Sequence, residues 1–386
     1  MITVDTIQPE KSRRRRRARI LVIASVAVVA LALTGCTTVG GTKVASNGNT
    51  VSSPADAAIR KIVGGRTLKV GFAPPILSEF YTEVEKAAFN KMKEYENRFG
   101  VKWVWERQGA LNDAHSGTET VGIVQGYIAR KFNAVFVCSA ANAATMQELY
   151  GVGSKKGVNF YQFNSTVELA NPSQETDPTG GLNTISNIGY DNRWQSGYIA
   201  GQYIAKTLHG KGTIIQIMGP AGSDWTKLRQ QGFKKAIADY PGLKIVGEAD
   251  GGYVRDKGLT AAQDLLTKFP DVNAIYGENE DMALGASQAI DGANLKHWNG
   301  TSGIVTIGAD GLVSGMKEIQ SGKLTATVDV NAVEIGERMI ETMFDHEVLG
   351  MTVNQFVRVP TIVVDKSNVD FRLDVLQASA NGPGKY

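Results

Sequence analysis

The side chains best suited to bind a ligand stand just after the short apolar runs of the chain. Pro74 to Tyr81 follow the first run, Ser139 and Asn142 the third, and Asn164 the fourth. In the second half of the chain the corresponding segments are Gly219 to Arg229, Asp250 to Tyr253, Asn279 with Glu280, and Asp310 with Gly311. The set combines aromatic rings, amides and a few charges, and it has no His or Cys at a nucleophile position. These residue types favour non-covalent binding over catalysis.

The apolar runs themselves predict short strands separated by amphipathic helices. The expected strands are 68–72, 102–106, 134–138, 159–163, 213–218, 244–248, 274–276 and 304–307. The expected helices between them are 79–98, 117–130, 143–155, 192–208, 225–239, 257–269, 281–291 and 312–321. Strands that alternate with helices predict parallel sheets that are covered on both faces. Ligands bind outside the carboxyl ends of such strands, which is where the polar set lies.

Eight strand–helix units are too many for a single sheet. A polar stretch from Asn164 to Ser186 divides them into two groups of four. After the second group come a strand at 323–330, a helix at 332–346 and a strand at 356–364. We therefore predict an α/β protein with two doubly wound parallel-sheet lobes joined by a hinge. The first lobe is expected at 64–187 and 331–350, the second at 188–330 and 351–370, and a C-terminal tail at 371–386.

The N-terminus has the pattern of a secretory signal. Arg13 to Arg17 and Arg19 precede an apolar run from Ile20 to Leu33, which is too short to cross a hydrocarbon core. The junction Leu33-Thr-Gly-Cys36 resembles the lipobox of bacterial lipoproteins, which implies removal of 1–35 and lipidation of Cys36. Two or more acyl chains would hold the protein stably at the membrane. Residues 36–63 are expected to form a flexible tether, so the protein is predicted to lie outside the cytoplasm.

Composition excludes several other classes. Hydrophobic residues make up 42% and charged residues 20% of the chain, as in ordinary globular proteins. Beyond residue 35 there remain 34 basic and 36 acidic side chains, so no basic surface for nucleic acid is expected. Two cysteines exclude a disulfide framework, and four histidines leave little for a metal site. We expect no cofactor and no metal.

Several motifs in order resemble the type I periplasmic binding proteins of sugar transporters, the ribose-binding group in particular, over roughly residues 66–370. The stretch Asn279 to Ala286 is close to that family's Asn-Asp-x-Met-Ala-x-Gly-Ala. The other segments that carry the resemblance are Gly189 to Gly197, Arg229 to Phe233, Lys257 to Leu266 with Pro270 to Val272, Ile307 to Gly311, and Gly322 to Thr327.

The resemblance implies roles for individual residues. The family's aromatic pair falls on Phe80 and Tyr81, and a second-lobe aromatic falls on Tyr253. The arginine, amide and carboxylate that bond sugar hydroxyls fall on Arg229, Asn279 and Asp310. Rings pack on the apolar C–H faces of a sugar, while Arg, Asn and Asp bond its hydroxyls. Ser139, Asn142, Asn164 and Trp225 complete the expected ligand-binding set.

Departures from the family's pattern bear on the ligand. Asn164-Ser165 replaces an Asp-Arg pair, Val330 beside Asp329 replaces the hinge Gln, Glu280 replaces Asp, and Trp225 replaces a small residue. The expected site is therefore less charged and more filled on one side. This change favours a small or acyclic polyol over a hexose or ribose.

Each residue also has a plain structural interpretation. Adjacent helical positions cannot both face the core, so we expect at least one of Phe80 and Tyr81 to meet the ligand. Asp310 and Asn279 could be helix N-caps only, and Arg229 could pair with an acid on a solvated helix face. Tyr253 could be an ordinary surface ring, and Trp225 a lid or plain packing. Cys138 is expected to behave as a small hydrophobe.

The resemblance implies a monomeric solute-binding lipoprotein, not an enzyme, that delivers a small carbohydrate or polyol to the permease of an ABC importer. A hydrolase would need a Gly-x-Ser-x-Gly elbow, which the sequence lacks. A sugar-responsive regulator would need an N-terminal helix-turn-helix in place of the signal. A binding protein that serves a signalling receptor remains open, because the sequence does not separate it from transport.

Overall fold

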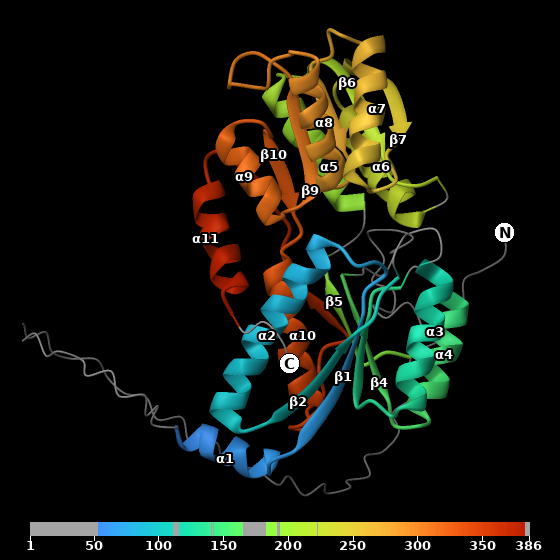
Figure 1. Cartoon of the computed structure of the whole chain (residues 1–386), viewed down its shortest axis with the longest axis vertical. Coiled ribbons are helices and arrows are strands. Elements are labelled where there is room, and N and C mark those ends of the chain that lie inside the picture. Colours follow the sequence, from blue (N-terminus) through green and yellow to red (C-terminus); the bar gives the residue numbers. More distant parts are fainter. Residues whose placement is uncertain are drawn as a thin grey trace, which may run out of the picture. The chain divides into compact units, whose positions relative to one another are not determined.

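The structure, a computed structural model, describes residues 53–110, 116–139, 141, 143–164, 183–190, 194–221 and 223–382. The predicted signal sequence, Cys36 and Asn142 lie outside these residues. Within them the chain forms two six-stranded sheets with helices on both faces (Figure 1), which confirms the predicted α/β fold with two parallel-sheet lobes. No helix among the described residues is both long and apolar enough to cross a membrane.

The first sheet has the strand order β11-β5-β4-β3-β1-β2, and all its strands are parallel. Its strands are β1 (Thr67–Ala73), β2 (Lys102–Arg107), β3 (Ala134–Val137), β4 (Asn159–Phe163), β5 (Ser186–Gly189) and β11 (Phe356–Arg358). The central strand β3 is buried at every position, as its unbroken apolar run predicts.

Two helices cover each face of the first sheet (Figure 1). On one face lie α2 (Glu79–Phe99) and α10 (Ala332–Glu347), and on the other lie α3 (Ser116–Ala129) and α4 (Ala143–Ser154). The helix α2 begins after Ser78 and ends at Gly100, which takes the left-handed conformation and donates its N–H to Glu96.

The second sheet has the order β12-β10-β9-β8-β6-β7, and only β12 is antiparallel to its neighbour. Its strands are β6 (Lys211–Met218), β7 (Gly242–Asp250), β8 (Ala274–Gly277), β9 (Val305–Asp310), β10 (Ala326–Asp329) and β12 (Ile362–Asp365). One face is packed by α5 (Trp194–Thr207) and α6 (Asp224–Ala238), and the other by α7 (Arg255–Lys268) and α8 (Glu280–Gly292). The helix α9 (Val313–Ser321) follows β9.

The expected strand at 356–364 is in fact two strands in different sheets. Phe356–Arg358 pairs with β5 in the first sheet, whereas Ile362–Asp365 pairs with β10 in the second. Pro360 lies between them and lacks the N–H that a continuous strand would use. The assignment of 351–370 to the second lobe alone therefore differs from the structure, because the chain changes sheets within that segment.

The predicted tether and the predicted C-terminal tail each include part of a helix. Within the predicted tether, α1 (Pro54–Val63) begins at Ser53, whose hydroxyl accepts the N–H of Asp56, and Arg60 Nη2 donates to the Asn97 carbonyl of α2. Within the predicted tail, α11 (Val369–Ala380) buries Leu373 and Leu376 in a cluster with α9 and α2 residues. The expectation of a flexible tether is therefore wrong for 54–63, and that of a tail is wrong for 371–380, because both segments form helices that pack on other elements.

Candidate functional site

Phe80 and Tyr81 begin the helix α2, and both rings are buried in the first lobe's main core cluster. Their ring centroids are 5.2 Å apart in an edge-to-face contact, and Tyr81 also lies edge-on to Phe163 at 6.0 Å. The expectation that one of the pair must face away from the core is wrong. At this sheet edge the first turn of α2 is surrounded by apolar groups on more than one side.

The hydroxyl of Tyr81 contacts the residues that follow two neighbouring strands, β3 and β4. Asn164, directly after β4, donates its Nδ2–H to this hydroxyl at 3.3 Å, and the thiol of Cys138, directly after β3, lies 3.5 Å from it. Burial raises the pKa of Tyr81 well above its usual value, so the hydroxyl keeps its proton. Cys138 is buried as expected, but it also takes part in this polar contact.

Asn164 has a backbone φ of 46°, a left-handed conformation that Asn adopts more readily than most residues. This turn at the end of β4 aims its amide at Tyr81. The other amide atom, Oδ1, is buried and has no hydrogen-bond partner among the described residues. It is therefore an acceptor at the strand ends that a hydroxyl group could satisfy. We call Phe80, Tyr81, Cys138 and Asn164 the first-lobe group.

Ser139 does not join this group. Its Oγ accepts the N–H of Ala141 at 2.9 Å, which is a local turn contact, and the residue is half-buried. Topology alone predicts a ligand role for Ser139, and with the described residues its side chain makes only this turn contact.

Arg229 is the centre of the polar residues in the second lobe. It is 6% exposed on α6, and its Nη2 lies 3.4 Å from Asp310 Oδ1, while Nη1 donates to the carbonyl of Glu278. The guanidinium also lies over the rings of Trp225 at 5.6 Å and Tyr253 at 6.0 Å. The alternative of an ion pair on a solvated helix face is therefore wrong. The Nε atom is buried without a partner among the described residues.

Asp310 ends β9 with a φ of 143°, outside the usual range for a side-chain-bearing residue. Leu312, not Asp310, occupies the N-cap position of α9, so the interpretation of Asp310 as that helix's cap is wrong. Burial raises the pKa of Asp310 to about 6, although Arg229 opposes the shift. The end of β9 thus places the Asp310 carboxylate beside the Arg229 guanidinium, where little water reaches the pair.

Tyr253 and Asn279 contact each other beside Arg229. Asn279 caps α8 through Oδ1, which accepts the N–H of Met282 at 3.0 Å, and its Nδ2 donates to the Tyr253 carbonyl at 3.2 Å. The cap interpretation is thus correct, and one Nδ2 hydrogen is left for another acceptor. Tyr253 is half-buried, with a φ of 59°, and its hydroxyl lies 3.1 Å from Thr226 Oγ1.

Trp225 contacts both the first lobe and Arg229 of the second lobe. Its ring lies 6.2 Å from that of Tyr190, which follows β5, and it packs against the core cluster that contains Phe80 and Tyr81. Trp225 is thus packed between the lobes' residues rather than free at the surface. We call Trp225, Arg229, Tyr253, Glu278, Asn279 and Asp310 the second-lobe group.

Glu278 is the member of this group that the sequence analysis missed. Its side chain is fully buried, and its carboxylate accepts from Gln216 Nε2 at 3.0 Å and from the Gly219 N–H at 2.9 Å. Burial raises the pKa of Glu278 to about 7. Its signal in the sequence is its place directly after β8, one residue before the motif that begins at Asn279.

Two of the departures from the family's pattern, at Glu280 and Val330, lie near the ends of β9 and β10. Glu280 is buried and accepts the N–H groups of Gly311 and Leu312 at 2.9 and 3.1 Å. After β10, where the chain crosses to the first lobe, Asp329 pairs with Arg372 of α11 and accepts the N–H of Asn331, while Val330 joins the first lobe's core. The bonds to Glu280 hold the segment after Asp310.

Two carboxylates of α2 also reach this segment. Glu83 Oε1 accepts the N–H of Val313 at 3.0 Å, and Glu79 accepts the N–H and hydroxyl of Ser314 at 3.2 and 3.0 Å. A helix start favours negative charge because its first N–H groups are unpaired. The first lobe therefore binds the start of α9, three residues after Asp310.

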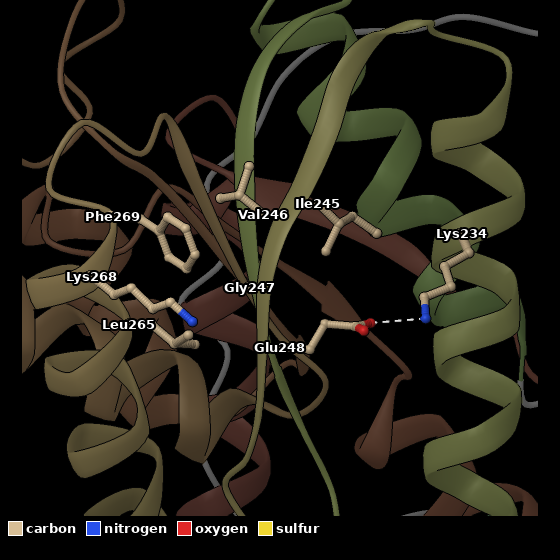
Figure 2. A pocket seen from close by; sticks show the side chains of 8 residues that line it. All are labelled: Lys234, Ile245, Val246, Gly247, Glu248, Leu265, Lys268 and Phe269. Carbon is tan, nitrogen blue, oxygen red and sulfur yellow. Dashed lines mark ion pairs between the residues drawn. The ribbon is translucent and has the colours of Figure 1, made fainter.

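A cavity of about 530 Å³ lies elsewhere, beside the edge strand β7 (Figure 2). Lys234 pairs with Glu248 on one side of β7, with 2.9 Å between Nζ and Oε1, while Lys268, Leu265 and Phe269 lie on the other side of that strand. A smaller cavity of about 150 Å³ is lined by residues of α8 and α9 together with Arg255 and Lys323. Neither is lined by an expected site residue, and both are polar surface hollows. The site is therefore assigned from side-chain convergence and not from cavity volume.

Comparison with known proteins agrees with this architecture. The Periplasmic binding protein domain family matches residues 70–348. The ribose import binding protein of Escherichia coli is 36% identical over 41% of this chain and 51% of its own length. The xylitol-binding protein of Mycolicibacterium smegmatis is 24% identical over 68% of this chain and 67% of its own. The chain spans about half the length of the ribose-binding relatives it matches.

Solved structures show the same fold. A solute-binding protein of an ABC transporter from Mycobacterium smegmatis, with bound glycerol, has a TM-score of 0.63 and 27% identity over 79% of this chain and 96% of its own. One from Actinobacillus succinogenes, with bound D-allose, has a TM-score of 0.66 and 23% identity over 79% and 99%. With the family match covering most of the chain and two parallel-sheet lobes in place, this chain belongs to the periplasmic binding protein family, in its type I form.

Proposed function

We propose that this protein is the extracytoplasmic solute-binding component of an ABC importer and that it binds a small, uncharged carbohydrate or polyol between its two lobes. The observation that carries the proposal is the buried Arg229–Asp310 pair, set between the rings of Trp225 and Tyr253. Charge-assisted donors and acceptors next to aromatic faces suit a molecule with alternating hydroxyl and C–H surfaces.

Buried atoms without partners support a hydroxyl-bearing ligand. Among the described residues, Asn164 Oδ1 in the first lobe is an acceptor without a partner, and Arg229 Nε in the second lobe is a donor without one. A hydroxyl group both donates and accepts, so one polyol could satisfy both. A buried group left without its partner costs about 1–3 kcal/mol, which would discriminate against molecules that lack a hydroxyl at that position.

We further propose that the ligand is acyclic, a tetritol or pentitol, with a pentose as the nearest cyclic alternative. At the position where the family has an Asp-Arg pair, this chain has the neutral amide of Asn164. One hydrogen of that amide already bonds the Tyr81 hydroxyl. Trp225 fills space beside Tyr190. A relative named for xylitol binding and a solved neighbour with bound glycerol are consistent with this choice.

Transport would need no covalent step. The ligand would bond residues of both lobes, and the lobes would close by motion at the crossing segments. Closure is favoured only by the ligand's extra affinity for the closed form. The closed protein would then dock on the permease, while the lipid at Cys36 would keep it at the membrane surface.

The test is a thermal-shift and calorimetric screen of the full chain in detergent against glycerol, erythritol, ribitol, xylitol, D-ribose and D-allose. A ligand at 100 times its Kd adds about 2.7 kcal/mol to the free energy of unfolding, so a true ligand gives a clear rise in Tm. A Tm that no member of the panel moves contradicts the proposed ligand class. Preference for a pyranose over every acyclic polyol contradicts the acyclic assignment only.

Lipidation has its own test. Mass spectrometry of the protein isolated from membranes of the producing bacterium would show an N-terminal diacylglyceryl-Cys36. A C36A variant should be released into the soluble fraction. A mature N-terminus at any other residue would contradict the lipoprotein assignment.

A further inference from the structure

Glu278 makes contacts that go beyond filling the space after β8. Its carboxylate accepts from Gln216 Nε2 and from the Gly219 N–H, its main-chain carbonyl accepts from Arg229 Nη1, and its own N–H donates to Ile217. One fully buried residue is therefore bonded to the end of β6, to the loop after β6 and to the arginine on α6.

The position of Gly219 decides where Tyr253 and Thr226 can stand. A Cβ on Gly219 would lie 2.2 Å from Tyr253 Cζ and 2.5 Å from Thr226 Oγ1, so both side chains pack directly on its main chain. The Tyr253 hydroxyl and Thr226 Oγ1 are in turn 3.1 Å apart. Because Glu278 holds the N–H of Gly219, it also restricts where the Tyr253 ring can lie beside Arg229.

The other bond of Glu278 acts on Arg229 itself. The guanidinium has one edge on the Glu278 carbonyl and Nη2 toward Asp310. Thr226 and Arg229 are three residues apart on α6, so they lie on the same face of that helix. The side-chain and main-chain contacts of Glu278 therefore act on both ends of the same helical turn.

We propose that Glu278 is a positioning residue that sets the geometry of Arg229 and Tyr253 and so determines the affinity of the site for hydroxyl-bearing ligands. This inference rests on the proposed function for its binding consequence, but its structural consequence is measurable without any ligand.

The charged and titratable groups that face Glu278 are Arg229 from α6, Glu248 from β7, Tyr276 from β8, and Tyr253 from the turn before α7. Only Arg229 is a cation, and its guanidinium is shared with Asp310. Two donors converge on the Glu278 carboxylate, which is the arrangement of an ionised, acceptor-only group.

Three variants of the full chain separate positioning from plain stability. E278A removes both side-chain acceptors. E278Q keeps the shape of the side chain, and its Oε1 can still accept the Gly219 N–H. Its amide N–H can donate to Gln216 Oε1 if the Gln216 amide turns over. Among the described residues, Gln216 Oε1 is buried without a partner. N273A is the matched control, because Asn273 Oδ1 accepts the Thr213 N–H at 2.8 Å near the opposite end of β6.

The ligand-free measurement is amide hydrogen exchange of the peptide that contains Gly219, together with the emission of Trp225 taken as the difference from W225F. E278A should speed exchange at Gly219 and shift the emission, whereas E278Q and N273A should leave both close to wild type. Unchanged exchange and emission in E278A would overturn the proposal, whether or not any polyol binds.

The binding measurement uses xylitol, ribitol and D-ribose as probes by calorimetry. E278A should weaken binding about tenfold or more, which corresponds to about 1.4 kcal/mol, while E278Q stays near wild type and N273A changes affinity less than twofold. Equal losses in E278A and N273A would show a general stability effect and overturn the proposal. If wild type binds none of the probes, the proposed ligand class fails and the exchange result alone decides the role of Glu278.

Discussion

The two halves of the candidate site are built from different chemistry. The first-lobe group consists of two rings, a thiol and an amide, and its polar contacts are between neutral atoms: Asn164 Nδ2, the Tyr81 hydroxyl and the Cys138 thiol. The second-lobe group contains a buried arginine with two nearby carboxylates, Asp310 and Glu278. The first half relies on packing, and the second on paired charges.

This difference has an energetic consequence. Neutral hydrogen bonds each contribute about 1 kcal/mol, and losing one is tolerated. A buried charge that loses its partner costs several times more, because it remains desolvated without compensation. The second lobe should therefore be sensitive to single substitutions, whereas the first lobe should change gradually.

Arg229→Met gives the largest expected effect. It leaves Asp310 buried without its cation, so we expect a loss of about 3–5 kcal/mol in the free energy of unfolding and no measurable polyol binding. Denaturant unfolding and calorimetry measure the two quantities. The control is Arg255→Met, which breaks a more exposed Arg–Asp pair at 2.7 Å in the same lobe and should cost at most about 1 kcal/mol. Equal losses in the two variants would remove the distinction between the halves.

Tyr81→Phe tests the neutral half. It removes the hydroxyl that Asn164 Nδ2 bonds and leaves that amide buried, so we expect a loss of about 1–2 kcal/mol in stability and about tenfold weaker polyol binding. Tyr127→Phe is the matched change in the same lobe. The Tyr127 hydroxyl donates to the Glu106 carbonyl at 2.9 Å, and this hydrogen bond lies away from the site. The substitution should lower stability to a similar extent but leave affinity unchanged. A loss of affinity in Tyr127→Phe would show that stability, not the site, is being measured.

The smallest expected effect is a pH dependence with opposite signs for stability and binding. Asp310 has its pKa raised from 3.8 to about 6 by burial, so the folded protein holds this proton more tightly than the unfolded chain. As the pH falls from about 6 toward 3.8, this group adds stability. Polyol affinity should instead fall about fourfold between pH 7 and 5.5, because an ionised Asp310 accepts hydroxyl donors and pairs with Arg229.

Calorimetric titrations across that pH range, with Asp310→Asn beside wild type, measure this effect. Asp310→Asn should bind weakly at every pH with a flatter profile, and E278Q should be used as the background to remove the second group that titrates near pH 7. A wild-type affinity that is constant from pH 7 to 5.5 would contradict the assignment of Asp310 as a hydroxyl acceptor.

Apart from β5, β11 and β12, the strands of both sheets were predictable to within three residues, because buried parallel strands are apolar runs bounded by helices. β5, with the sequence Ser-Asn-Ile-Gly, was missed because its burial comes from neighbouring strands and not from its own composition. The same limit hid the change of sheet after Arg358 and the helix α11, whose Arg372 pairs with Asp329 far away in the chain.

The residue types of the candidate site were predictable, but not their partners. Arg229 and Asp310 were both expected from motifs, yet only the fold shows them paired and buried. At least one of Phe80 and Tyr81 was expected to meet the ligand, and the fold places both rings in the first lobe's core cluster. Glu278 was missed because a lone Glu after a strand is common, and only its contacts with Gly219 and Gln216 distinguish it.

The sequence by itself determined the two-lobe α/β fold, the family and the strand ends where binding residues stand, because apolar periodicity and short motifs are local properties of the chain. The tertiary structure decided which charges are paired, which amide atoms are left without partners, and that carboxylates of α2 bind the start of α9. Those features depend on distances between residues up to 235 positions apart, and no local pattern encodes them.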